Sequence, residues 1–212
     1  MAHNSHDVDD ARGLARQVGI DFGAALTVAL AYIGDSLGIF QVLADDGPFT
    51  SEQLASRSGL NERYLREWLA TMAAAHYVDY DADAHAFSLN AAQRTVLLDQ
   101  HSPLNMAGGF QYAVACIRQL PALTDAFRHG GGVRFADFGE EISEAIRRMF
   151  QPGYEQWVAN EWIPALPEIH QRLQAGGEAA EVGCGSGQCL IPVVRSFPNS
   201  RFVGYDLDPA SL

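Results

Sequence analysis

A short run of glycines near the end of the chain constrains its fold more than any other feature. Gly183, Gly185 and Gly187 follow an apolar segment typical of a buried strand, residues 179–182, and precede a helical segment, residues 188–196. Glycine adopts the backbone angles that a tight strand-to-helix turn requires, and it lets a ligand approach the backbone. Such a turn also presents N–H groups that favour an anionic group. The sequence therefore predicts a ligand-binding loop between a strand and a helix.

An acidic residue lies where a ligand with a ribose would need it. Asp206 ends a second strand-like segment about 20 residues after the loop, a position at which a carboxylate binds ribose hydroxyls in nucleotide-binding α/β folds. A loop for NAD or FAD would have the spacing G-x-G-x-x-G, which needs a third glycine at position 188, where the chain has Gln188. With Glu181 ahead of the loop, the pattern is instead E-x-G-x-G-x-G, and NAD is disfavoured.

The first hundred residues have a different, helical pattern. Residues 10–39 place apolar side chains at helical spacing, which predicts a long packed helix whose nearly apolar run, residues 22–34, is buried. Residues 37–98 predict three helices followed by a hairpin, the order of a winged helix. Three local signals set their ends: a capping box of Thr50 and Gln53 that starts the second helix, Gly59 that ends it, and Asn61 that caps the third.

Between the winged helix and the glycine loop, residues 103–173 are helical by pattern but interrupted. The interruptions are Pro121, residues 130–132, Pro152, Pro164 and Pro167. We interpret this stretch as linking helices with a lid, in which the three consecutive glycines at 130–132 form a hinge.

Composition excludes several classes of function. The chain has 212 residues, 48% of them hydrophobic, and a net charge of -12, so a soluble globular protein is expected and binding to nucleic acid or a membrane is not. The apolar run at 22–34 is shorter than the roughly 20 residues that cross a bilayer. The three cysteines lack metal-ligand spacing, so no metal site is expected. Their small number and the absence of a signal peptide predict a cytoplasmic protein.

These motifs resemble those of class I S-adenosylmethionine-dependent methyltransferases. VGCGSG at residues 182–187 looks like motif I of that family, and GYD at 204–206 looks like its next acidic motif. Residues 37–78 are similar to the N-terminal winged-helix dimerisation module that precedes the catalytic domain in many bacterial small-molecule methyltransferases. The resemblance implies an enzyme that transfers a methyl group from S-adenosylmethionine to a small-molecule acceptor, and a homodimer formed through the N-terminal helices.

The resemblance also implies roles for individual residues. The positions that it assigns to the cofactor are Glu181, Gly183, Cys184, Gly185, Gly187, Asp206 and Leu207. The glycines would line the methionine end, Glu181 would order the loop and the amino group, Asp206 would bind the ribose, and Leu207 would lie beside the adenine. Tyr154 and Trp157 would belong to a lid. No catalytic residue, acceptor or general base is assigned.

The expected fold class is a mostly helical winged-helix domain plus the start of an α/β Rossmann-like methyltransferase domain, with its first two parallel strands only. We expect domains at 1–100, 101–175 and 176–212. Two parallel strands leave both sheet edges unpaired, so the chain is expected to be C-terminally truncated relative to that fold. One alternative is a non-catalytic truncated relative that acts as a dimeric interaction or winged-helix regulatory module.

A second alternative is DNA recognition by residues 61–75, the helix that would enter the groove of a duplex. It ranks last, because Glu62 and Glu67 offset the charges of Arg63 and Arg66 in that helix.

Overall fold

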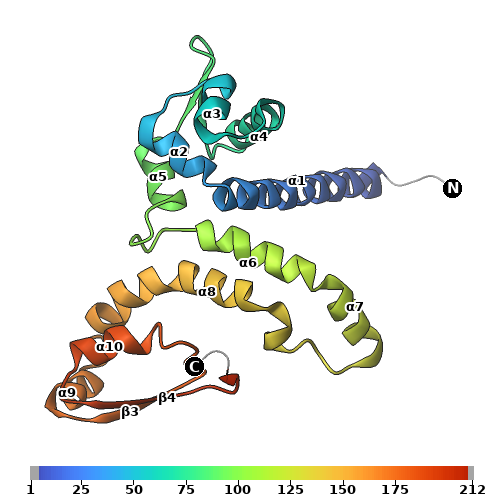
Figure 1. Ribbon diagram of the computed structural model, residues 1–212. Helices are drawn as coiled ribbons and strands as arrows, with labels where there is room; N and C mark the ends of the chain where they lie inside the picture. Colours follow the sequence, from blue (N-terminus) through green and yellow to red (C-terminus); the bar gives the residue numbers. More distant parts are fainter. Residues whose placement is uncertain (1–4, 210–212) are drawn as a thin grey trace. The chain divides into compact units, whose positions relative to one another are not determined.

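The computed structural model describes residues 5–209, which form two compact units that divide after Asn90 (Figure 1). The N-terminal unit contains α1 (Ser5–Ser36), α2 (Ile39–Asp46), α3 (Ser51–Ser58), α4 (Glu62–Ala74), β1 (Asp79–Asp81) and β2 (Ala86–Ser88). The C-terminal unit is also mostly helical and ends in two strands. The predicted class, a mainly helical chain with a winged helix and few strands, is confirmed, whereas the predicted domain boundaries stay a prediction.

Local capping explains where the winged-helix elements begin and end. The Thr50 side chain accepts a hydrogen bond from the Gln53 N–H, and the Gln53 side chain accepts one from the Thr50 N–H. Gly59 ends α3 in the left-handed region at φ 72°, and the Asn61 side chain accepts from the Arg63 N–H at the start of α4. All three predicted signals are therefore present. They fix the residue at which α3 ends and the residue at which α4 begins.

The hairpin forms the wing. Strands β1 and β2 pair antiparallel, and an isolated bridge between Phe49 and Phe87 adds backbone from the segment before α3. The buried face of β2 places Phe87 against the helices, while all three residues of β1 are exposed. The wing is thus anchored by one strand only.

Trp68 of α4 is the centre of the N-terminal core. Its ring packs edge-on against Phe40 with 5.1 Å between ring centroids, and its indole Nε1 donates to the Leu30 carbonyl oxygen of α1 at 2.8 Å. The ring also occupies the space that a Cβ at Gly34 would need. Gly34 therefore lets the last turn of α1 lie directly on the indole, which fixes α1 against α4.

The expectation that the apolar run at 22–34 is buried is wrong for its first part. Ala31 and Gly34 are buried, but Phe22 is 65% exposed and Leu26 is 51% exposed. The reason is that α1 contacts α2 and α4 with its last turns, while its earlier turns extend beyond them (Figure 1). By length and composition alone, residues 10–36 of α1 also satisfy the requirements of a membrane span.

Two long helices, α6 (Ala107–Arg118) and α8 (Glu140–Gly153), pack side by side and run antiparallel (Figure 1). They make the most extensive helix contact of the C-terminal unit. Gly108 permits it, because a Cβ there would lie 2.8 Å from the Ala145 carbonyl oxygen. The unit also contains α5 (Ala91–Leu97), α7 (Leu120–His129), η1 (Phe135–Phe138) and α9 (Pro167–Ala175).

Pro152 does not interrupt the helix as the sequence pattern suggests. It lies inside α8, which continues into a π-helical segment, η2 (Tyr154–Trp162). Proline lacks an N–H, so one backbone hydrogen bond of α8 is missing at Pro152, yet the helix runs on to Gly153. The π-helical turns that follow include the bond from the Ile163 N–H to the Val158 carbonyl oxygen at 3.0 Å.

The last segment is strand, loop, helix, strand. β3 (Glu178–Val182) pairs in parallel with β4 (Arg201–Tyr205), and α10 (Leu190–Ser196) connects them. The helix begins two residues later than residues 188–196 predict, because residues 183–189 form turns. The loop between β3 and α10 is the setting of the candidate site.

We expect Trp68→Ala to lower the free energy of unfolding of the N-terminal unit by about 3–5 kcal/mol, because it removes a buried aromatic ring and leaves a cavity against Gly34 and Phe40. Urea denaturation followed by circular dichroism at 222 nm measures the change. Arg63→Ala on the same helix is the control. It loses only the exposed ion pair with Glu67 and should cost no more than about 0.5 kcal/mol. Equal effects of the two substitutions would contradict this account of the core.

Candidate functional site

The glycine loop after β3 has the backbone that only glycine adopts easily. Gly183, Gly185 and Gly187 have φ angles of 78°, 49° and 76°. A Cβ at Gly183 or Gly185 would meet nothing within 4 Å, so glycine is needed there for its backbone angles and not for lack of space. The bond from the Gly187 N–H to the Cys184 carbonyl oxygen, 2.9 Å, closes the turn.

Asp206 ties this loop to the end of β4. Its Oδ2 accepts a hydrogen bond from the Gly185 N–H at 2.7 Å, and its Oδ1 accepts one from the Asp208 N–H at 2.9 Å. The backbone N–H groups of Asp208 and Gly185 stabilise the ionised form and lower the pKa of Asp206. The carboxylate is therefore ionised and held in place, and each of its oxygens retains further acceptor capacity.

Backbone bonds reinforce that link. The N–H groups of Gly183 and Cys184 both donate to the Tyr205 carbonyl oxygen, at 2.7 and 3.0 Å. The Cys184 side chain lies over Gly204, where a Cβ would come within 2.6 Å of its sulfur. Cys184 thus packs the loop onto β4, and Gly204 supplies the room. The structure brings together the glycine loop and Asp206 as the sequence motif requires.

Glu181, in β3, lies two residues before the loop and interacts with Cys189 at the loop's other end. Its Oε2 is buried and has no hydrogen-bond partner among the residues that the structure describes. Burial raises the pKa of Glu181, an effect that the Cys189 thiol partly offsets. A buried acceptor without a donor is rare and costly in a folded protein. This oxygen is suited to accept a hydrogen bond from a ligand's ammonium or amide group.

Tyr154 and Cys189 complete the surroundings of Glu181. Both side chains pack against one apolar cluster formed by Val158, Ala159, Leu173, Val193 and Phe197. Burial is the main cause that raises the pKa of each, and the Glu181 carboxylate contributes to both shifts. Tyr154, the first residue of η2, therefore lies near Glu181 and Cys189, and its role in a lid stays a prediction.

The remaining predicted positions are more open. Trp157 lies farther along η2 and packs near Trp162, with 6.3 Å between ring centroids. Leu207, which directly follows Asp206, is fully exposed. An exposed leucine beside a ribose-binding carboxylate is compatible with a planar base lying over it. The roles of Glu181, Gly183, Cys184, Gly185, Gly187, Asp206 and Leu207 stay predictions.

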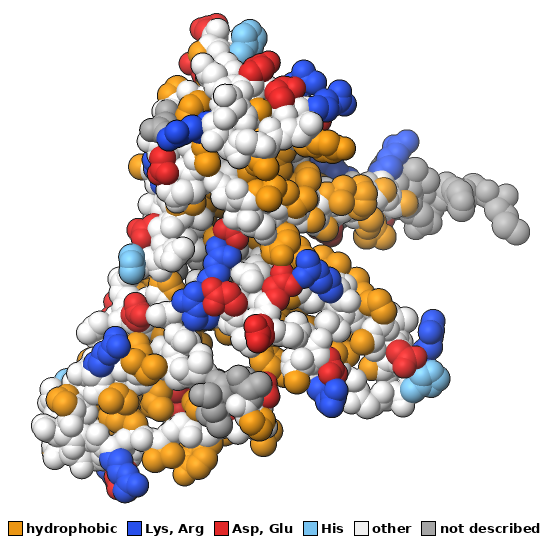
Figure 2. Space-filling view, viewed as in Figure 1, with side chains coloured by type: hydrophobic (Ala, Val, Ile, Leu, Met, Phe, Trp, Pro, Cys, Tyr) orange, Lys and Arg blue, Asp and Glu red, His pale blue; other side chains and the backbone are white. Residues whose placement is uncertain are grey.

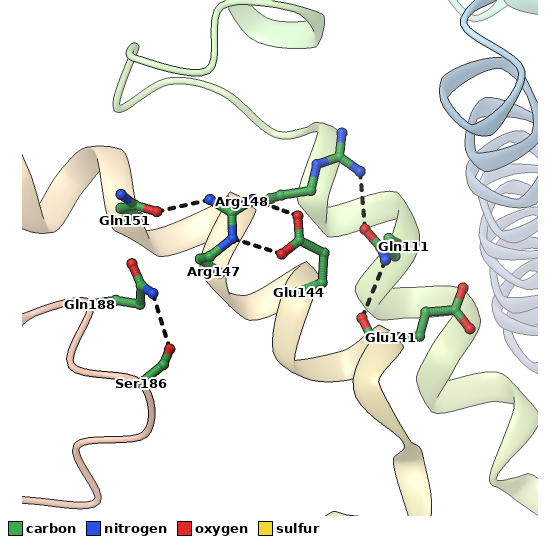
Figure 3. Close-up of polar contacts among 8 residues, drawn as sticks. All are labelled: Gln111, Glu141, Glu144, Arg147, Arg148, Gln151, Ser186 and Gln188. Carbon is green, nitrogen blue, oxygen red and sulfur yellow. Dashed lines mark hydrogen bonds and ion pairs between the residues drawn. The ribbon is translucent and has the colours of Figure 1, made fainter. Parts of the chain in front are cut away.

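A polar network lies on the α6 and α8 side of this unit (Figure 3). Arg147 donates from Nε to Glu144 at 2.7 Å and from Nη1 to the Gln151 Oε1 at 3.0 Å. The bond to Arg147 lowers the pKa of Glu144. Arg148 donates to the Gln111 Oε1 at 3.0 Å, which connects α8 to α6.

Figure 3 also draws the Gln188 side chain donating to the Ser186 Oγ, 3.0 Å away within the glycine loop. This bond holds the two polar side chains together.

The sequence analysis does not assign two contributors to the site. Cys189 lies beside Glu181. Gly204 accommodates the Cys184 side chain, a role that depends on the register between β3 and β4. Both contacts depend on the fold, and no spacing in the sequence indicates them.

These residues fit S-adenosylmethionine. The unpartnered Glu181 oxygen suits the α-ammonium of the methionine part, and the fixed Asp206 carboxylate suits two ribose hydroxyls. The N–H groups of the three glycines are bonded within the protein, so what the glycines offer a cofactor is a loop surface without their own side chains, which it can approach closely.

Comparisons with known proteins agree with this geometry. Residues 24–99 match the family model described as an Rv2258c-like winged HTH domain. A mitomycin biosynthesis 6-O-methyltransferase of Streptomyces lavendulae is 25% identical over 179 residues, which cover 80% of this chain and 50% of that protein.

Solved structures share the fold. The mitomycin 7-O-methyltransferase MmcR superposes with a TM-score of 0.66 at 22% identity, covering 95% of this chain and 61% of that one. Human N-acetylserotonin methyltransferase, solved in complex with S-adenosylmethionine, gives 0.62 at 16% identity, covering 93% and 60%. The chain thus spans about half the length of the curated relative that it matches. The chain has an N-terminal winged-helix domain of the Rv2258c-like type and shares the fold of these solved methyltransferases.

Proposed function

We propose that this chain is the cofactor-binding N-terminal portion of an S-adenosylmethionine-dependent methyltransferase that acts on a small-molecule acceptor. The observation that supports it most is the loop whose three glycines have positive φ angles and in which the Gly185 N–H donates to the Asp206 carboxylate. The Glu181 Oε2, which has no hydrogen-bond partner among the described residues, offers a second acceptor. In the two relatives named as O-methyltransferases, the acceptor atom is oxygen. We extend that chemistry to this chain as part of the proposal.

The residues of this chain would hold and orient the cofactor. Asp206 would accept hydrogen bonds from the ribose hydroxyls, and Glu181 would pair with the ammonium group. Tyr154, from the π-helical segment, would close over the methionine part. The bound cofactor supplies an electrophilic methyl group on a sulfonium, so positioning of the acceptor would contribute much of the rate. A general base would be needed only where the acceptor must lose a proton.

We expect isothermal titration calorimetry to detect saturable binding of S-adenosylmethionine to the purified chain, and Asp206→Ala to abolish it. The substitution removes the ribose acceptor and leaves the Gly185 N–H without its partner, so the loop loses one of its bonds to the end of β4. Glu178→Gln, an exposed position in the same sheet, is the control and should bind like the natural chain. Absence of binding by the natural chain would favour the non-catalytic regulatory module.

Glu181→Gln should have opposite effects on stability and on binding. At neutral pH it removes a partly buried carboxylate whose ionised form is poorly compensated, so the urea midpoint should rise. The same change removes a charge-assisted hydrogen bond to the ammonium, so affinity for S-adenosylmethionine should fall about tenfold or more. Urea denaturation and calorimetry measure the two effects. Loss of both stability and binding would indicate a structural role for Glu181.

Binding should weaken on acidification through the raised pKa of Glu181. The protonated carboxyl no longer attracts the ammonium, whereas Asp206, whose pKa is lowered, stays ionised over that range. Calorimetric titrations at a series of pH values test this expectation. In Glu181→Gln the acid-dependent loss should be absent. The same loss in both proteins would assign the titration to another group.

A further inference from the structure

Cys189 lies against Glu181 on the covered face of the two-stranded parallel sheet. In β3, Glu181 pairs in register with Gly204 of β4, so the two residues share a face of the sheet. A Cβ at Gly204 would come within 2.6 Å of the Cys184 sulfur and 3.4 Å of the Leu190 Cδ2. This is therefore the face that α10 covers, and Cys189 directly precedes Leu190, the first residue of that helix.

The opposite face of this sheet is open. Successive residues of a strand point to opposite faces, so Val182 and its register partner Tyr205 point away from α10. These two side chains are 87% and 58% exposed. Figure 2 shows hydrophobic side chains at the surface of this last segment, at the lower left. The apolar surroundings of Glu181 therefore come from the α10 side, where Cys189 and Tyr154 pack against the buried cluster.

The Cys189 thiol is a hydrogen-bond donor to the Glu181 carboxylate. Oε2 has no hydrogen-bond partner among the described residues, so the thiol bonds to Oε1. Burial raises the pKa of the Cys189 thiol, which keeps it in the S–H form that can donate. The other titratable side chains on this side of the described sheet are Tyr154, from η2, and Cys184, over Gly204.

We propose that Cys189 is a positioning residue for the cofactor, whose thiol holds the Glu181 carboxylate by Oε1 and so keeps Oε2 available to the ammonium group of S-adenosylmethionine. A carboxylate bonded at one oxygen no longer turns freely about its last side-chain bond, so the other oxygen keeps its direction before a ligand arrives. Ordering the group in advance reduces the entropy that binding must offset. The inference rests on the proposed function, because the ammonium is the group that Oε2 would meet.

The chemistry of a thiol suits both neighbours of Cys189. A free cysteine packs as a small apolar side chain, which fits the cluster that contains Val193 and Phe197. Its S–H is also a weak donor, so it can orient a carboxylate without satisfying it as fully as a stronger donor would. The Glu181 carboxylate is thus held in place and still retains acceptor capacity for a ligand.

Two substitutions of Cys189 separate positioning from packing, because they preserve opposite properties of the side chain. Cys189→Val keeps an apolar group and removes the donor, whereas Cys189→Ser keeps a donor and loses apolar packing. We expect the urea midpoint to be higher for Cys189→Val than for Cys189→Ser. Affinity for S-adenosylmethionine, measured by calorimetry, should have the reverse order, with Cys189→Val about three- to tenfold weaker than the natural chain.

Titration of the free chain by ¹³C NMR measures the same hydrogen bond without a ligand. In protein with ¹³C-labelled glutamate, the Glu181 carboxyl signal is assigned by its loss in Glu181→Gln. The pKa of Glu181 should rise in Cys189→Val, because the thiol favours the ionised form, and should be lower in Cys189→Ser than in Cys189→Val. Cys116→Ser, the same chemical change in α6, is the matched control and should alter neither the titration nor the affinity.

The two measurements distinguish failure of this inference from failure of the proposed function. An equal pKa of Glu181 in Cys189→Val and Cys189→Ser would overturn the inference. An affinity that follows the urea midpoint, with Cys189→Ser binding more weakly than Cys189→Val, would also overturn it and make Cys189 a packing residue. If the natural chain shows the expected titration but does not bind S-adenosylmethionine, the bond between thiol and carboxylate is confirmed. The proposed function is then wrong, and the positioning role with it.

Discussion

The candidate site depends on one hydrogen bond, from the Gly185 N–H to the Asp206 carboxylate. The two residues belong to segments separated by a helix, and only the parallel pairing of β3 with β4 brings them together. The left-handed glycines aim the N–H at the carboxylate, and the ionised carboxylate holds the loop in that form. Each partner therefore maintains the geometry of the other. A ligand that bonds to Asp206 meets a loop that is already folded.

The Glu181 carboxylate is less well compensated than that of Asp206. Glu181, Cys189 and Tyr154 are three groups that can ionise in one partly apolar setting, and burial raises the pKa of each. No described residue satisfies the Glu181 Oε2. A fold optimised for stability alone would place an apolar side chain there. Under the proposed function, the unpartnered carboxylate would cost stability in the free protein and recognise the ammonium group of the ligand.

Local signals in the sequence predicted the elements well. The Thr50 and Gln53 capping box, Gly59 and Asn61 each act within one turn of the chain, so their effects can be derived without tertiary context. The glycine spacing and Asp206 likewise predicted the loop and its partner. Features that depend on distant contacts were not predictable. The exposure of Phe22 follows from how far α2 and α4 reach along α1, and the local rule that proline ends a helix did not anticipate an α8 that runs through Pro152.

The three glycines at 130–132, all with positive φ angles, form an exposed tip between α7 and η1. A protease would cleave there before most other places, because the backbone is exposed and nothing lies within 4 Å of the position of a Cβ at any of the three glycines. The two new ends would nevertheless stay together. Gln119 donates to the Asp137 carbonyl oxygen at 2.9 Å, and Arg118 pairs with Glu141 just below the tip. A nicked molecule would therefore migrate as two fragments under denaturing conditions and as one particle in solution.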